Sequence, residues 1–113
     1  MKNLINYSDF NKIEIRVGTI ISAELNEKLK KPSILLKIDF GEEIGIKKSS
    51  AQLTKNYKSD QLICKQVVAV INFSQKQIGN FISEVLVLGF PDNSNEPILI
   101  IPDKKIENGG KLY

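Results

Sequence analysis

The sequence predicts an all-β fold, a five-stranded barrel with short helices, formed by a single domain over residues 1–113. Alternation of apolar and polar residues recurs along the chain, a Gly-containing turn joins two alternating segments directly, and helical spacing is confined to short stretches. With 42% hydrophobic and 26% charged residues in 113, the composition is that of an ordinary globular domain.

The first expected elements are a short helix and a strand. Ser8 is expected to cap one or two helical turns that place Phe10 and Ile13 on one side. From Ile13 the apolar period changes to two and continues to Ile21, which predicts a half-buried strand. Gly18 inside this strand predicts a bulge or a sharp bend.

The next two strands are expected to form a hairpin. A polar connection over residues 26–32 leads to the cleanest alternation in the sequence, residues 34–40. A tight turn at residues 41–42 then leads directly into a third alternating segment, residues 44–48.

The two-residue period is lost over residues 50–65, where Leu53, Tyr57 and Leu62 fit short helical turns. Residues 66–73 are almost continuously apolar, which predicts a strand covered on both sides. Beyond it we expect a polar loop, a buried strand, a turn and a short edge strand, over residues 74–80, 81–90, 91–96 and 98–101.

This order of elements is that of a five-stranded Greek-key barrel of the OB type, extended at both ends. The helical link between the third and fourth strands favours the OB type over an SH3-like or other small barrel. OB ligands lie across strands two and three, between the loops that join strands one to two and four to five. Here these loops are residues 26–32 and 72–80.

The residue inventory excludes most enzymatic chemistry. The chain has no His and a single Cys, Cys64, so it offers no Ser/His/Asp or Cys/His nucleophile, no disulfide framework and no Cys/His metal cage. Adjacent Glu42 and Glu43 fall in a turn, where their side chains diverge. We therefore expect a binding protein rather than an enzyme, without cofactor or metal.

The chain has no apolar run long enough to span a membrane, and its first residues lack the apolar stretch of a signal peptide. These two observations lead us to expect a cytoplasmic protein without membrane insertion.

Basic and amide side chains gather on the predicted ligand face. Residues 1–58 carry a net charge of +4, whereas residues 59–113 carry −1. Such groups suit a phosphate backbone, an acidic peptide or backbone carbonyl groups, although lysines of this kind are also common as plain solvated surface. The candidates are Lys28, Lys30 and Lys31 in the first loop, Lys47, Lys48, Ser49 and Gln52 in and after the third strand, and Asn72, Lys76 and Gln77 in the second loop.

Apolar candidates bracket the second loop. Phe73, Ile78 and Phe81 can line an apolar groove, and filling the core is the alternative role for the two phenylalanines. Ser83 and Glu84 follow in a buried-looking strand, where a carboxylate needs either a partner or a solvent-open pocket.

Several blocks resemble a known family. Residues 13–20 (IEIRVGTI) are similar to the first strand of the tRNA-binding domain family, OB modules found free or fused to aminoacyl-tRNA synthetases. Within it, residues 40–52 (FGEEIGIKKSSAQ), 72–73 (NF), 76–79 (KQIG) and 83–90 (SEVLVLGF) resemble the CsaA branch. These blocks occur in the right order and cover essentially the whole chain.

The resemblance implies a homodimeric, secretion-related chaperone that binds preproteins or unfolded polypeptide and the export motor SecA. It also implies an alternative, structure-specific tRNA binding on the same face. Where tRNA-binding members carry a Ser-x-Gly-Met segment preceded by basic residues, this chain has Ser83-Glu84-Val85 and no cation over residues 80–84. An anionic Glu84 there favours polypeptide over tRNA.

The homodimer is also expected from the apolar residues at both ends of the chain, which would leave large exposed patches on a monomer. They are Leu4, Ile5, Phe10, residues 98–101, Leu112 and Tyr113.

Overall fold

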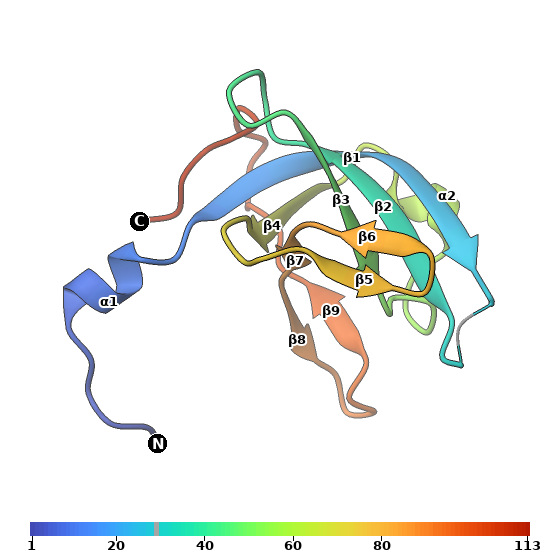
Figure 1. Ribbon diagram of the computed structural model, residues 1–113, viewed down its shortest axis with the longest axis horizontal. Coiled ribbons are helices and arrows are strands. Elements are labelled where there is room, and N and C mark those ends of the chain that lie inside the picture. The colour runs from blue at the N-terminus through green and yellow to red at the C-terminus, as the bar shows by residue number, and fades with distance from the viewer. Residues whose placement is uncertain (29) are drawn as a thin grey trace.

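The structure is a computed structural model that describes residues 1–28 and 30–113. Its elements in chain order are α1 (Tyr7–Asn11), β1 (Ile15–Asn26), β2 (Ser33–Asp39), β3 (Ile46–Ala51), α2 (Ser59–Leu62), β4 (Gln66–Val70), β5 (Lys76–Ile78), β6 (Phe81–Ser83), β7 (Leu86–Val87), β8 (Gly89–Pro91) and β9 (Pro97–Leu99) (Figure 1).

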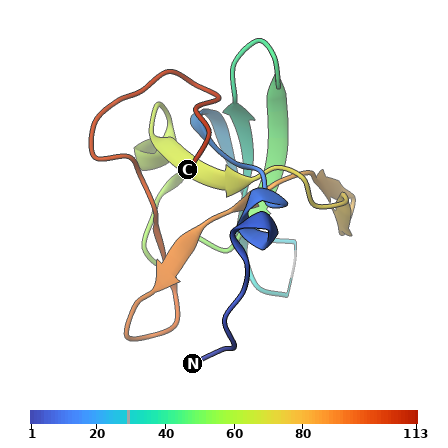
Figure 2. The same ribbon diagram turned by 90° about the vertical axis from the view of Figure 1, so that its left-hand side faces the viewer.

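One antiparallel sheet of five strands, in the order β3-β2-β1-β4-β7, dominates the structure. The sheet curls until its last strand approaches its first. The backbone N–H groups of Glu84 and Val85, just before β7, donate to the carbonyl oxygen of Lys48 in β3 at 2.7 and 3.3 Å. The result is a half-barrel (Figure 2), which confirms the predicted five-stranded β fold.

The core on the inner side of the sheet is mainly aliphatic. Gly18 allows β1 to lie close to β2, because a Cβ at Gly18 would stand 2.7 Å from Ile38 Cγ2. The bulge expected at Gly18 lies instead between Ile20 and Ser22, where the pairing with β2 shifts register. The side chains with almost no exposed surface include Ile20, Ile34, Leu36, Ile38, Phe40, Leu62 and Val67.

The expectation for residues 74–90 was wrong in two respects. Residues 74–80 are not a plain loop, because β5 and β6 pair as a hairpin that turns through Gly79, whose φ is 62°. The single strand expected over residues 81–90 is divided into β6, β7 and β8. Each of these short strands pairs with a different partner, β5, β4 and β9 respectively, and the chain must change direction between them.

The N-terminal arm, residues 1–12, stands clear of the barrel, and no residue of its helix α1 is buried (Figure 1). The helix was expected, but its cap is Asn6 rather than Ser8. Asn6 has an extended backbone, and its N–H donates to the Asp9 carboxylate at 3.2 Å.

The C-terminal segment, residues 100–113, crosses the outer side of β1 and β4. The side chain of Gln66 alternates with that of buried Val67 and therefore points outward. Its amide holds the segment in both directions: Nε2 donates to the carbonyl oxygen of Ile106 at 2.6 Å, and Oε1 accepts the N–H of Ile106 at 3.1 Å.

Candidate ligand-binding face

Two side chains attach the end of the β5–β6 hairpin to the edge of β3. The backbone N–H of Ser50 donates to Ser83 Oγ at 3.0 Å, and the N–H of Lys48 donates to Glu84 Oε1 at 3.0 Å. The second carboxylate oxygen of Glu84 accepts from Gln75 Nε2 at 3.4 Å. Glu84 therefore obtains its partners from the β3 backbone and from Gln75.

A pocket of about 250 Å³ lies beside this attachment. Its apolar wall includes Phe73, Ile78 and Leu86, and Phe73 and Leu86 are 57% and 50% exposed. Lys76 and Glu84 add one charge of each sign to the lining. The pocket thus brings together several of the residues predicted from the sequence, namely Phe73, Lys76, Ile78, Ser83 and Glu84.

The predicted lysines of β3 lie on opposite sides of the sheet, since successive side chains of a strand alternate. Lys47 is on the same side as Ser49, which is buried and faces the barrel interior. Lys48 is on the outer side, where its Nζ stands 5.3 Å from the centroid of the Phe81 ring. Phe81 and Lys48 therefore form a cation–π pair that joins β6 to β3.

Two predicted amides are used in local structure. Asn72 ties the loop after β4 to the start of β1: its Oδ1 accepts the N–H of Glu14 at 2.9 Å and its Nδ2 donates to the carbonyl oxygen of Lys12 at 2.7 Å. Gln77 donates to the carbonyl oxygen of Gly79 at 3.0 Å, within the hairpin turn.

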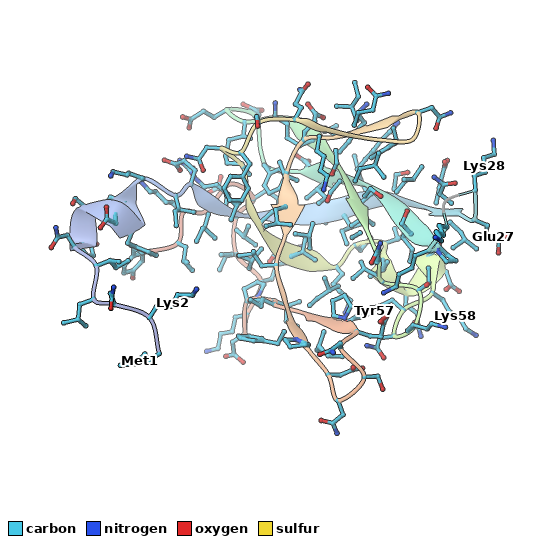
Figure 3. The ribbon with its side chains drawn as sticks, turned by 60° about the horizontal axis from the view of Figure 1, so that its bottom comes forward. Met1, Lys2, Glu27, Lys28, Tyr57 and Lys58 are labelled. Carbon is cyan, nitrogen blue, oxygen red and sulfur yellow. The ribbon has the colours of Figure 1, made fainter. Side chains whose placement is uncertain are left out.

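The predicted basic loop lies at the far end of β1 and β2. Lys28 extends away from the body there (Figure 3), and Leu29 of the same loop lies outside the described residues. Lys30 is exposed, whereas Lys31 Nζ pairs with the Glu96 carboxylate at 3.3 Å. Gln52 lines a separate hollow between the end of β3 and β7.

Two residues near the predicted ones were not themselves predicted: Leu86, which lines the pocket beside the β5–β6 hairpin, and Lys37, which lies beside Lys48. Leu86 was assigned to a buried strand, and only the division of that strand exposes it. Lys37 stands directly opposite Lys48 in the β2–β3 ladder. The sequence feature that could have predicted this pairing is the length of the turn between β2 and β3, because turn length sets the register of a hairpin.

A second, apolar hollow of about 290 Å³ lies between β1, β4 and the C-terminal segment. Ile15, Val68, Ile100 and Leu112 are among its lining residues. None of its lining residues belongs to β2 or β3, so it is separate from the pocket beside the β5–β6 hairpin.

Two basic side chains contact the Glu14 carboxylate beside this hollow. Arg16 Nε donates to Glu14 Oε2 at 2.9 Å, and Lys111 Nζ lies 3.6 Å from Glu14 Oε1. The hydrogen bond from Arg16, supported by the charge of Lys111, lowers the pKa of Glu14 below its ordinary value.

Over residues 1–28 and 30–113, no group of three or more Cys, Asp or Glu side chains stands close enough to hold a metal ion. Among the helices that the structure describes, none is long and apolar enough to cross a bilayer.

Comparison with known proteins gives the family. Residues 15–111 match the family model of the tRNA binding domain. The chain belongs to the tRNA-binding domain family. This is a family of binding modules and chaperones rather than a catalytic fold.

Within the tRNA-binding domain family the chain is similar to two solved chaperone structures. CsaA from Bacillus anthracis str. Ames is 42% identical, with a TM-score of 0.92 over 98% of this chain and 100% of that one. The CsaA chaperone protein from Picrophilus torridus is 51% identical, with a TM-score of 0.90 over 97% and 100%. The predicted resemblance to the CsaA branch is confirmed.

The tRNA-binding domain also occurs as part of larger enzymes. The methionine–tRNA ligase of Methanococcoides burtonii is 38% identical over 112 residues. The match covers 99% of this chain but only 16% of the ligase's length.

Proposed function

We propose that the protein is a non-enzymatic molecular chaperone that binds extended polypeptide beside β3 and the β5–β6 hairpin. The pocket walled by Phe73, Ile78 and Leu86 carries this proposal. Its exposed apolar wall suits an apolar client side chain, and Lys76 and Glu84 suit polar groups of the same client. Two similar proteins of nearly the same length are named as chaperones.

The CsaA-type resemblance extends the proposal to the client proteins, the partner and the cellular location. We infer that preproteins on their way to export are among the clients, that the export motor SecA is a partner, and that one binding domain over residues 1–113 does this work in the cytoplasm. Of the remaining predicted residues, Asn72 supports the loop that carries Phe73, and Gln77 supports the turn of the hairpin.

We also propose that the protein works as a homodimer. In the N-terminal arm Leu4, Ile5 and Tyr7 are 96%, 73% and 71% exposed. The hollow beside β1 and β4 is also lined mainly by apolar side chains. The arm of a second copy, seated along this hollow, would remove both apolar surfaces from water twice in a twofold dimer.

Polypeptide binding is tested with a fluorescein-labelled, permanently unfolded client protein. The fluorescence anisotropy of the client is followed as the proposed chaperone is added. Phe73→Ser and Leu86→Ser should each weaken binding several-fold, because each removes apolar surface from the pocket. Leu25→Ser is the matched control, since Leu25 is 52% exposed, like Leu86, but lies at the end of β1. Equal effects of all three substitutions would refute the pocket as the binding site.

The dimer is tested by light scattering at micromolar concentration, where a mass of about twice 12.7 kDa is expected. Ile5→Asp and Tyr7→Asp should shift the protein to the monomer without lowering its secondary-structure content, because α1 buries no residue within the chain. A monomeric wild-type protein contradicts the proposal.

Binding of tRNA is the second candidate. The family match and the similarity to a segment of methionine–tRNA ligase favour it. It is tested beside polypeptide binding on one preparation over a KCl series. The tRNA affinity should fall steeply with salt, because phosphate contacts release counterions, while polypeptide affinity should change little. If tRNA binds with a steep salt dependence and no polypeptide binding is detected, tRNA binding becomes the first candidate.

A further inference from the structure

Lys37 and Lys48 face each other across the β2–β3 ladder. The N–H and the carbonyl oxygen of Lys48 are both bonded to residues 84–85 and therefore point away from β2. Lys37 and Lys48 are thus a pair that exchanges no ladder hydrogen bonds, the type whose Cα atoms stand closest, at about 4.5 Å. Their side chains emerge next to each other on the outer side of the sheet.

This placement opposes two positive charges. Like charges directly opposite in a sheet are unfavourable. Among the residues the structure describes, the ion pairs involve Lys12, Arg16, Lys31 and Lys111, and neither Lys37 nor Lys48 takes part in one. The chain therefore leaves this pair of ammonium groups without a carboxylate of its own.

One of the two ammonium groups is held in position. Lys48 is half-buried, and the Phe81 ring lies 5.3 Å from its Nζ. On the other side of Lys37, the β1 residue in register is Ser22, which contributes a hydroxyl to the same row. The outer side of the sheet thus presents a hydroxyl, two ammonium groups and an aromatic ring in sequence across β1, β2, β3 and β6.

The chemistry of this row favours phosphate over polypeptide. In the middle of a sheet the backbone N–H and carbonyl groups are used by the ladder, so a polypeptide crossing there gains no main-chain hydrogen bonds. Lysine ammonium groups and hydroxyls, in contrast, are common partners of nucleic-acid phosphates. A phosphodiester group between Lys37 and Lys48 would accept from both ammonium groups and halve their net charge without needing a backbone donor.

We propose that Lys37 and Lys48 together hold a phosphodiester group of a single-stranded RNA that crosses the outer side of β2 and β3. The inference rests on the tRNA-binding candidate and adds to it a defined phosphate subsite and Lys37 as a contact. It makes no use of the apolar pocket at Phe73, so the polypeptide and RNA sites can be separated by substitution.

The probe is a short fluorescein-labelled oligouridylate, whose binding is measured by anisotropy over a KCl series. The double variant Lys37→Gln/Lys48→Gln should bind several-fold more weakly at low salt. Its plot of log affinity against log salt should lose about 0.7 of slope, the value for one phosphate of a single strand. Each single variant should cause most of this loss, because the two lysines share one phosphate.

Lys104→Gln is the matched control. Lys104 is exposed like Lys37 but belongs to the C-terminal segment. Its substitution should leave the slope unchanged, and an equal loss would show diffuse surface charge and overturn the subsite. Thermal melting checks the fold: the double variant should melt close to the wild-type temperature, because the relief of the like-charge opposition offsets the lost cation–π contact between Lys48 and Phe81.

Three outcomes separate this inference from the proposals it follows. Oligouridylate binding with an unchanged slope in the double variant overturns the subsite alone. No oligouridylate or tRNA binding by the wild type overturns the subsite and the RNA candidate together, while unfolded-polypeptide binding still reports on the chaperone proposal. If the two lysines instead control binding of an oligoglutamate peptide, the occupant is an acidic polypeptide and the RNA assignment is wrong.

Discussion

Glu84 and Lys48 exchange two hydrogen bonds: the N–H of Lys48 donates to Glu84 Oε1 at 3.0 Å, and the N–H of Glu84 donates to the carbonyl oxygen of Lys48 at 2.7 Å. A side-chain oxygen thus replaces one of the backbone acceptors that a neighbouring strand would supply. The attachment of the β5–β6 hairpin to the barrel depends on this exchange and on the bond from Ser50 to Ser83 Oγ.

Replacing Glu84 tests this attachment. Glu84→Ala removes the acceptor of the Lys48 N–H and should lower the free energy of unfolding by about 1–2 kcal/mol. Glu84→Gln keeps an oxygen acceptor and should cost less. Urea denaturation of both variants measures the difference. Equal stability of the alanine variant and the wild type would show that water replaces the carboxylate without loss.

Gly18 should tolerate no side chain. In Gly18→Ala the new Cβ would stand 2.7 Å from Ile38 Cγ2 and 2.8 Å from Phe40 Cδ1, in the middle of the core. The overpacking should reduce the free energy of unfolding by about 1–3 kcal/mol, measured by urea denaturation. Gly45→Asn is the control, because nothing lies within 4 Å of a Cβ there and Asn tolerates its φ of 87°. A larger loss at Gly45 would contradict the packing argument.

The stability of the protein should fall in acid partly through Glu14. Arg16 and Lys111 lower the pKa of Glu14 in the folded state, so its contribution is fully present above the unfolded pKa and is lost as the pH falls through the folded one. Melting temperatures of the wild type and Glu14→Gln, compared from about pH 7 to about pH 3, should converge as Glu14 is protonated. Parallel curves would mean that Glu14 does not contribute to the acid transition.

Cys64 has a left-handed backbone, with φ of 71°, and is exposed. Cys64→Gly removes the Cβ that makes this conformation unfavourable and should leave the melting temperature unchanged or raise it, because the relief offsets the greater freedom of glycine in the unfolded chain. Cys64→Val should lower it, since branched residues are disfavoured there. Equal melting of the two variants would show that φ relaxes at no cost.

The fold could be predicted because strong alternation marks β1, β2 and β3 and a tight turn joins the last two. The hairpin over residues 76–83 could not, since its strands are three residues long and rely on Ser83 and Glu84 reaching the distant β3. Hydrogen bonds between residues far apart in the sequence leave no periodic signal.

The candidate site, like the fold, could be predicted from the sequence only in part. Phe73 and Ile78 were identified because a loop at this point of the barrel is where OB proteins bind. The structural use of Asn72 was not visible, because its partners, Lys12 and Glu14, lie at the other end of the chain. Lys37 could not be predicted as a site residue, because a single lysine in a strand gives no signal until the register places Lys48 opposite it.

The attachment of the hairpin also affects what β3 can recognise. A free strand edge pairs with almost any extended chain, because main-chain groups are the same in every sequence. Here the N–H groups of Lys48 and Ser50 are already bonded to the protein's own side chains. The edge is therefore closed to indiscriminate sheet extension, and discrimination between partners is left to the side chains around it.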